Sequence, residues 1–113
     1  MVHESLKAAE ELEKEGISVE VIDLRTLVPW DKDKVIESVK KTNHLVVAHE
    51  TWKRAGWGAE IASVVQEEAF DYLDAPITRV GAKNVPIPFA PKLQDFVTPN
   101  YKDIIEAIKK ILR

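Results

Sequence analysis

Histidines are the side chains of this chain best suited to acid–base or metal chemistry, and there are three: His3, His44 and His49. His44 and His49 bracket a short apolar run, and their odd separation on a strand puts them on opposite faces, so they cannot share a metal ion. His49, with Glu50 beside it, stands at the C-terminal end of that predicted strand, where open α/β sheets bind ligands, so a general acid–base role is conceivable. We favour the alternative that His49 is hydrogen-bonded to backbone or lies in a subunit contact.

A Gly-Trp-Gly turn before a predicted helix is the second candidate site. Free N–H groups at a helix start can hold an anion, and Lys53 and Arg54 stand close to Gly56 and Gly58. The spacing of the two glycines matches neither the dinucleotide-binding nor the P-loop fingerprint. A tight strand-to-helix turn with close packing explains the glycines as well, so the turn predicts either packing or a phosphate-bearing ligand.

Two tryptophans flank those basic residues. Trp52 and Trp57 could stack on nucleic-acid bases, but 16 Lys and Arg against 19 Asp and Glu give a net charge of -3, which lacks the basic footprint of nucleic-acid binding. Large aromatic side chains on a loop more often anchor a protein interface. The sequence therefore predicts a protein contact here and no nucleic-acid partner.

The remaining polar residues assemble no active site. Asp23 and Arg25 alternate on a predicted strand, and Arg25 could meet a phosphate, although an ion pair that fastens the following loop is the interpretation we favour. No Ser–His–Asp order or Gly-x-Ser-x-Gly elbow is present. The chain has no cysteine, which excludes a thiolate metal site and a cysteine nucleophile. The residues alone predict no catalytic, cofactor-binding or metal-binding site.

The elements that must position these residues alternate between helix and strand. Apolar residues at helical spacing predict helices over 2–15, 31–42, 59–73 and 99–112. Runs of β-branched or continuous apolar residues predict strands over 17–25, 44–49 and 77–81. Gly16 is placed to end the first helix and Asp31 to cap the second, while three prolines predict an irregular connection over 81–97. This alternation predicts a parallel sheet with helices on both sides.

Length and composition fit one globular domain over residues 1–113. The chain is 45% hydrophobic and 31% charged, which is ordinary for a folded domain. No apolar run approaches the roughly 20 residues of a membrane span, and the N-terminus has no signal-peptide core. We therefore predict a cytoplasmic protein.

Four motifs in register resemble a known family. The runs VIDLRTLVPWD, KTNHLVVAHE, GWGAEIASVVQEEAFDYLDAPITRV and NVPIPFAPKLQDF are similar to the C-terminal domain of transketolase-type enzymes. The resemblance covers residues 2–112 and is most specific to the beta subunit of the 2-oxo acid dehydrogenase decarboxylase component, of pyruvate or branched-chain type. It implies an α/β fold, a three-layer α/β/α domain with a mainly parallel sheet.

The resemblance also implies that the cofactor and the catalytic groups lie on other segments of the enzyme. Thiamine diphosphate and Mg²⁺ are held by the beta subunit's N-terminal domain and by the alpha subunit, and the complex decarboxylates a 2-oxo acid and passes the acyl group to lipoamide. The C-terminal domain binds no cofactor and catalyses nothing by itself. Its expected partners are the alpha subunit, a second beta subunit and the subunit-binding domain of the dihydrolipoyl acyltransferase. The resemblance places the subunit interface at His49, Glu50, Trp52, Gly56, Trp57, Gly58 and Glu60, and acyltransferase docking at Asp74 and Arg113.

At its N-terminal end, this sequence departs from the pattern of the family. The family's domain begins with an antiparallel edge strand and then a strand that ends just before MVHESLKAA, and this second strand lies between those predicted here over 17–25 and 44–49. We therefore expect a fragment that lacks the first two strands, whose neighbours pair directly or accept another copy or subunit, with self-association in isolation. The alternatives are a free-standing α/β domain that binds a phosphate-bearing ligand at Gly56–Gly58, and a structural fragment with no separate function.

Overall fold

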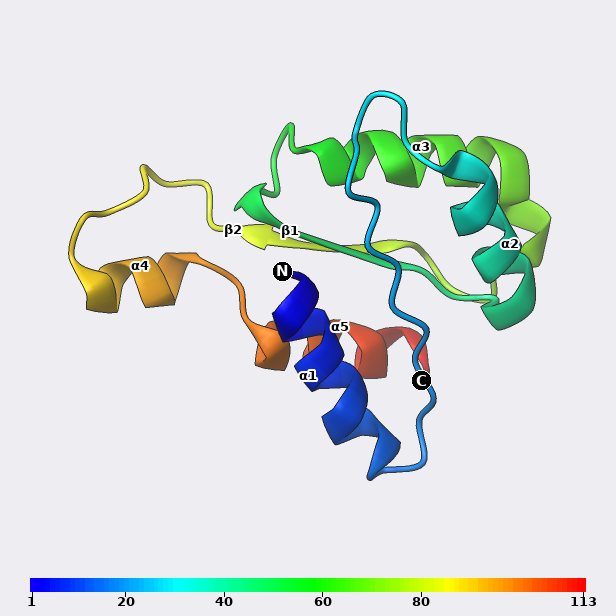
Figure 1. Cartoon of the computed structure of the whole chain (residues 1–113), viewed down its shortest axis with the longest axis horizontal. Coiled ribbons are helices and arrows are strands. Elements are labelled where there is room, and N and C mark those ends of the chain that lie inside the picture. The colour runs from blue at the N-terminus through cyan, green and yellow to red at the C-terminus, as the bar shows by residue number, and fades with distance from the viewer.

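Two parallel strands lie at the centre of the protein, between helices (Figure 1). The computed structural model describes every residue from Met1 to Arg113. In the sheet, Val46 is opposite Thr78 and Ala48 is opposite Val80, and both strands run in the same direction. The elements in order are α1 (Val2–Glu13), α2 (Lys32–Thr42), β1 (Val46–Trp52), α3 (Trp57–Ala69), the short 3₁₀ helix η1 (Phe70–Tyr72), β2 (Thr78–Ala82), α4 (Pro91–Val97) and α5 (Tyr101–Ile111).

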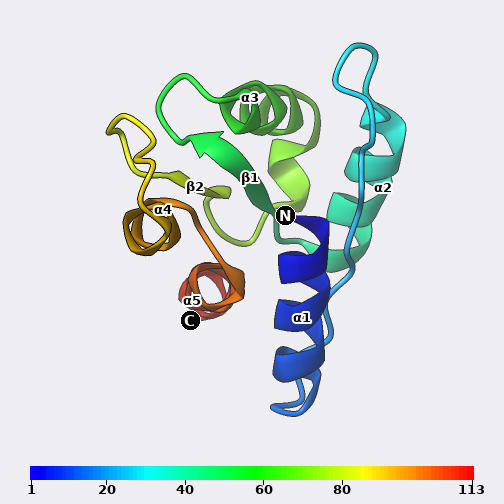
Figure 2. The ribbon, with the colours of Figure 1, turned by 60° about the vertical axis from the view of Figure 1, so that its left-hand side comes forward.

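Helices cover both faces of the sheet, which confirms the predicted three-layer α/β/α fold. On one face α1 packs against α5, and on the other face α2 packs against α3 (Figure 2). Each face has its own apolar cluster, and burying a large aliphatic side chain contributes about 1.5–3 kcal/mol. The first cluster is built on Ala8, Leu12, Val80, Ile104, Ala107 and Ile108, and the second on Val35, Val39, Ile61, Val65 and Ala69.

Local signals at the helix ends act as the sequence predicts. The Asp31 carboxylate accepts a hydrogen bond from the Lys34 backbone N–H at 3.0 Å and caps α2. Gly16 has a φ of +81°, the left-handed conformation that lets the chain turn after α1. The last helix begins two residues later than predicted, because Asn100 and Asp103 form a reciprocal capping box at its start.

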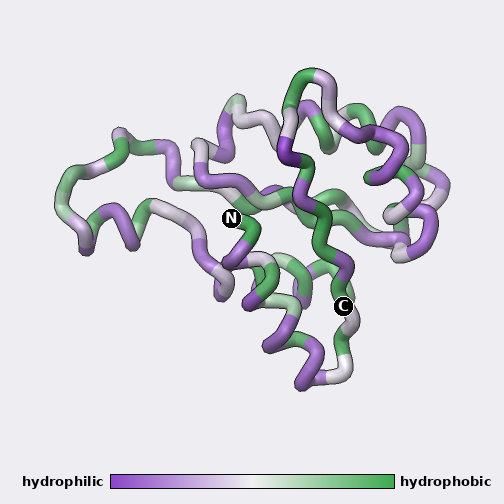
Figure 3. The backbone as a smooth tube through the Cα atoms, in the orientation of Figure 1, coloured by the Kyte–Doolittle hydropathy of each residue, from purple (hydrophilic) through white to green (hydrophobic).

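The prediction of a strand over residues 17–25 is wrong. The segment is extended, but no N–H from Ser18 to Leu24 donates to a backbone carbonyl, so it does not belong to the sheet. Its side chains nevertheless alternate: Ile17 and Val19 pack on the α1–α5 cluster, whereas Ile22 and Leu24 pack on the α2–α3 cluster. Figure 3 shows apolar and polar residues following one another along this segment. The period of two is that of a strand, but no strand lies next to it to complete a ladder.

The connection over 81–97 is also more ordered than predicted. It contains α4, with Pro91 in the first turn, a position where proline has no hydrogen bond to lose and its fixed φ suits a helix. The connection projects as an arm beyond the carboxyl ends of β1 and β2 (Figure 1).

Candidate subunit interface

The loop between β1 and α3 is organised around the imidazole of His49. The Nδ1 atom lies 3.1 Å from the Thr51 carbonyl oxygen, which can only accept, so Nδ1 carries the proton and donates. The other nitrogen, Nε2, is buried and has no hydrogen-bond partner. His49 is therefore hydrogen-bonded to backbone at a strand end, as the favoured interpretation predicts, and its Nε2 atom faces packed neighbours.

Three glycines make room for this ring. A Cβ atom on Gly58 would lie 2.7 Å from His49 Nε2, and one on Gly81 would lie 2.9 Å from His49 Cε1. A Cβ on Gly56 would lie 2.7 Å from His49 Cε1 and would also collide with the Trp52 carbonyl oxygen. Close packing thus explains the Gly-Trp-Gly turn without a ligand. The phosphate-binding interpretation stays a prediction, and no contact in the structure favours it.

The two tryptophans have different surroundings. Trp52 is 47% exposed and its indole N–H donates to the Val85 carbonyl at 2.8 Å, which ties the end of β1 to the arm. Trp57 instead packs on the α2–α3 cluster, and its indole nitrogen is buried without an acceptor. Only Trp52 is therefore available to a partner at this surface.

Charged residues on the loop remain largely free. Glu50 is exposed, and its carboxylate lies 3.6 Å from the α-amino group of Met1. An exposed ion pair of this kind contributes little to the free energy of folding. Glu60 is exposed in the first turn of α3. Lys53 and Arg54 are held through their backbones. Arg79 donates to the Lys53 carbonyl at 2.7 Å, and the Arg54 backbone N–H donates to the Asn84 side-chain oxygen at 3.3 Å. The exposed members of the predicted interface are Glu50, Trp52 and Glu60, and the others shape the loop from within.

Asp74 and Arg113 lie far from this loop in the fold. Both are exposed. The connection from η1 into β2 and the C-terminus lie toward the amino ends of the strands, whereas the His49 loop lies at the carboxyl ends (Figure 1). The structure therefore separates the predicted docking residues from the predicted subunit interface.

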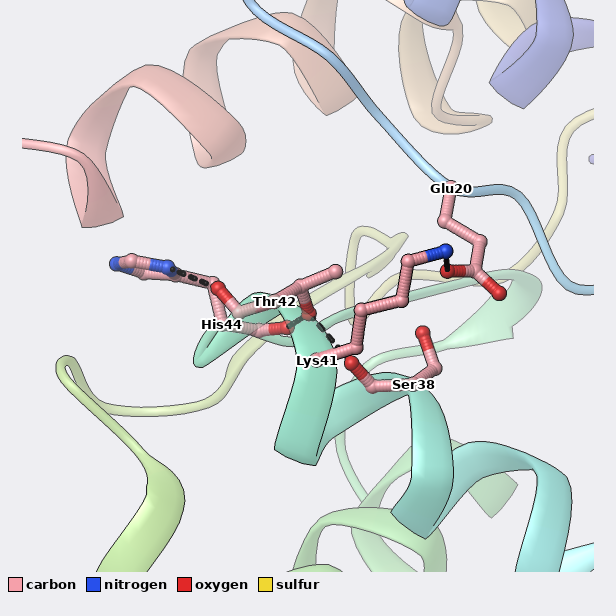
Figure 4. A network of polar contacts seen from close by, with 5 residues as sticks. All are labelled: Glu20, Ser38, Lys41, Thr42 and His44. Carbon is pink, nitrogen blue, oxygen red and sulfur yellow. Dashed lines mark hydrogen bonds and ion pairs between the residues drawn. The ribbon is translucent and has the colours of Figure 1, made fainter.

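The other polar residues singled out in the sequence have structural roles. Asp23 and Arg25 form the expected exposed ion pair, with Nε and Oδ2 3.4 Å apart. His44 Nδ1 donates to the Thr42 carbonyl at 3.0 Å, in the contact network of Figure 4. No group of three or more His, Asp and Glu side chains is placed to hold a metal ion. No helix is long and apolar enough to cross a membrane.

The arm also carries an exposed apolar surface that is not among the predicted sites. Phe89 is 98% exposed and Phe96 is 69% exposed, with Lys83 4.8 Å from the centre of the Phe96 ring. Large apolar residues do recur in the sequence of this proline-rich connection. Their spacing follows neither a helix nor a strand period, so the pattern does not indicate which of them share one face. The exposed apolar side chains of this surface are Val85, Ile87, Phe89, Leu93 and Phe96.

A comparison with known families agrees with the layered α/β arrangement. The family model for the transketolase C-terminal domain matches residues 1–104. The chain belongs to this family. The match confirms the resemblance at the level of the domain, with a parallel sheet between helical layers.

Curated relatives are similar to the chain over nearly its whole length. A protein of Rickettsia felis named "Pyruvate dehydrogenase E1 component subunit beta" is 56% identical over 107 residues, 95% of this chain and 33% of the relative. The mitochondrial subunit of that name from Saccharomyces cerevisiae is 51% identical over 110 residues, 96% of this chain and 30% of the relative. The Bacillus subtilis subunit is 46% identical over 112 residues, 99% and 34% respectively. The chain spans about a third of the length of these relatives.

Proposed function

We propose that this chain forms the C-terminal domain of the beta subunit of a thiamine diphosphate-dependent pyruvate dehydrogenase, where it serves assembly and docking rather than catalysis. The observation that carries the proposal is the 46–56% identity to pyruvate dehydrogenase beta subunits over almost the entire chain. In this proposal the complete enzyme decarboxylates pyruvate oxidatively and transfers the acetyl group to lipoamide. The branched-chain type, which the motifs left open, has no support among the relatives described above.

The proposal places the cofactor on other segments of the enzyme. Mg²⁺ that bridges a diphosphate needs clustered carboxylate or amide oxygens, and the residues of this chain form no such cluster. At the Gly56–Gly58 turn, the space beside the glycines is filled by the His49 ring. The residues present therefore do not fit thiamine diphosphate and Mg²⁺, and we derive no step of the reaction from them.

In this proposal the His49 loop contacts the alpha subunit and a second beta subunit. Trp52 supplies a half-exposed aromatic surface that is held rigid by its bond to the Val85 carbonyl, and rigid aromatic anchors dominate interface energies. Glu50 and Glu60 add charges that can select a basic partner surface. His49, Gly56, Trp57 and Gly58 fix the shape of the loop from inside.

Docking of the acyltransferase's subunit-binding domain is assigned to Asp74 and Arg113. What supports this assignment is that both side chains are exposed and lie at the end of the fold away from the His49 loop, so both partners can bind together. A charge reversal tests it. We expect Asp74→Lys or Arg113→Glu to weaken binding of the subunit-binding domain in an intact assembly about tenfold. Asp95→Lys, on the exposed face of α4 at the opposite end, is the matched control.

A chimera tests the proposed function directly. The aligned third of the Bacillus subtilis beta subunit would be replaced by this chain and co-expressed with the alpha subunit of that enzyme. We expect an assembled complex that turns over pyruvate and passes acetyl groups to lipoamide. A chimera that folds, judged by circular dichroism and thermal unfolding, but recovers no alpha subunit would overturn the assembly role.

Two further expectations belong to the same proposal. We expect the chain to be a fragment of a longer beta subunit and to self-associate when isolated, which sedimentation at several concentrations measures. The predicted cytoplasmic location is a proposal for a bacterial source only, because relatives from yeast, Dictyostelium discoideum and pea are named mitochondrial. Fractionation with a tagged full-length protein decides it.

A further inference from the structure

The outer edge of β2 carries backbone groups that have no partner. Thr78 donates its N–H to the Leu45 carbonyl at 3.2 Å, so in this parallel ladder Thr78 and Val80 direct their backbone groups at β1. Arg79 and Gly81 therefore direct theirs at the opposite edge, where β2 has no neighbouring strand. No loop or cap hydrogen bond reaches these groups. Both residues are only half-buried, which leaves this edge accessible to a second chain.

A polar cavity of about 480 Å³ lies along this edge. Residues of β2, of α5 and of the connection between α4 and α5 line it. Figure 2 shows β2 on the side of the sheet where α4 and α5 lie. At Lys83 the edge is already occupied, because the Lys83 N–H donates to the Val97 carbonyl at 3.2 Å. The free stretch is Thr78–Ala82, five residues that span about 16 Å at 3.3 Å per residue.

The charged side chains around the cavity are not paired with one another. Four cations and three carboxylates line it, which leaves a net charge of +1. None of the seven takes part in an ion pair of this protein, so a charged ligand has no salt bridge to displace. These side chains are Lys53, Arg79, Lys83, Lys110, Asp95, Asp103 and Glu106.

Two of the cations lie on the α3 side of this edge. Side chains alternate along a strand, and Val80 packs in the α1–α5 cluster, so Arg79 points to the opposite side of the sheet. The Arg79 guanidinium donates to the Lys53 carbonyl at 2.7 Å. A Cβ on Gly81 would lie 3.0 Å from Lys53 Cα, which places Lys53 next to the edge at Gly81. On the other side of the sheet, α5 lines the cavity with Ala107 and its two carboxylates.

We propose that the outer edge of β2 binds an extended acidic peptide of a partner protein, antiparallel to β2, with the pattern acidic–apolar–acidic. Antiparallel pairing is the more stable arrangement per residue and gives hydrogen-bonded pairs at Gly81 and at Arg79. The first acidic side chain lies opposite Gly81 beside Lys53, and the second lies opposite Arg79, a cross-strand pair of opposite charge. The residue between them lies opposite Val80 and faces α5, where a short apolar side chain fits. This proposal is independent of the proposed function.

The same cations disfavour pairing between two copies of this edge. Two antiparallel β2 strands would place Lys53 and Arg79 of both copies on one face of the joined sheet. Like charges on neighbouring strands destabilise a pair, and charged side chains on an edge strand are a known protection against self-pairing. An acidic partner reverses the sign of this interaction. Charge therefore selects an acidic peptide over a second copy of the chain.

An acetylated, amidated Thr-Glu-Val-Glu-Thr peptide tests the proposal on the 113-residue chain. In an NMR titration at low salt we expect saturable binding, with hydrogen exchange of the Arg79 and Gly81 amides slowed at least tenfold. N-methylation of the two glutamate amides, which face β2, should weaken binding at least tenfold. N-methylation of the valine and the last threonine, which face away, should weaken it less than threefold. No saturable binding up to about 10 mM peptide, protection of other amides only, or equal losses from the two methylation patterns would overturn the proposal.

Charge reversal locates the binding site and its direction. Lys53→Glu alters an exposed side chain of the cavity, and Lys92→Glu on α4, also exposed but outside the cavity, is the matched control with the same change in net charge. We expect Lys53→Glu to weaken the peptide about fivefold and Lys92→Glu less than twofold. Lysine in place of the first glutamate should restore affinity for Lys53→Glu, whereas lysine in place of the second should not, because it would face Arg79. Equal effects of the two variants would contradict the site, and restoration by the second lysine alone would refute the antiparallel direction.

Discussion

Substituting Gly58 with alanine tests whether the glycines of the His49 loop serve packing. The new Cβ would lie 2.7 Å from His49 Nε2, 2.9 Å from His49 Cδ2 and 3.2 Å from Val47 Cγ1. Overpacking of this kind costs about 1–3 kcal/mol. The better helix propensity of alanine returns at most about 1 kcal/mol, and less in the first turn of α3. We expect Gly58→Ala to lower the free energy of unfolding by about 1–2 kcal/mol.

A double-mutant cycle assigns the cause. His49→Ala by itself removes the hydrogen bond to the Thr51 carbonyl and leaves a cavity, and should cost about 1–3 kcal/mol. With the imidazole gone, only the Val47 contact remains tight at Gly58, so Gly58→Ala should become neutral within about 0.5 kcal/mol. The expected coupling energy is therefore about 0.5–2.5 kcal/mol, with the sign of a relieved clash.

Urea denaturation measures all four proteins, and the midpoint shift at constant slope gives each free energy. Gly16→Ala is the control, because nothing lies within 4 Å of the added Cβ and its cost of about 1 kcal/mol arises only from the positive φ. That cost should be the same with His49 or Ala at position 49. If Gly58→Ala is as destabilising without the imidazole as with it, packing against His49 is not what requires the glycine.

Three further predictions concern charge and ligands. The hydrogen bond from Lys41 holds the pKa of the Glu20 carboxyl below its ordinary value of 4.5, so the pair stabilises the fold above pH 4.5 and this contribution is lost as the pH falls through the lowered pKa. In Lys41→Met, NMR titration should show the Glu20 midpoint move back toward 4.5, and an unchanged midpoint would refute the ion pair between Lys41 and Glu20. Titration of the isolated chain with inorganic phosphate or thiamine diphosphate should give no saturable binding, whereas binding abolished by Lys53→Ala or Arg54→Ala would establish the phosphate-binding alternative. The isolated chain should not turn over pyruvate or any other 2-oxo acid, and turnover that follows the purified chain through gel filtration would end the proposal of a non-catalytic domain.

The sequence by itself determined the features that depend on neighbouring residues. Helical periodicity and capping residues such as Asp31 and Gly16 placed α1, α2 and α3 within a few residues, because cap hydrogen bonds and left-handed turns are local. The apolar run before His49 placed β1, and the alternation of elements gave the layered α/β fold. Motifs in register identified the family.

Tertiary structure alone decided whether an extended segment is a strand. Residues 17–25 have the period-two pattern, and their side chains pack on both layers as a strand's would, but a ladder needs a second backbone at hydrogen-bonding distance, which no local pattern reports. The same holds for the loop. Gly81 is 23 residues beyond the Gly-Trp-Gly motif, and only the fold brings it together with Gly56 and Gly58 around a single imidazole.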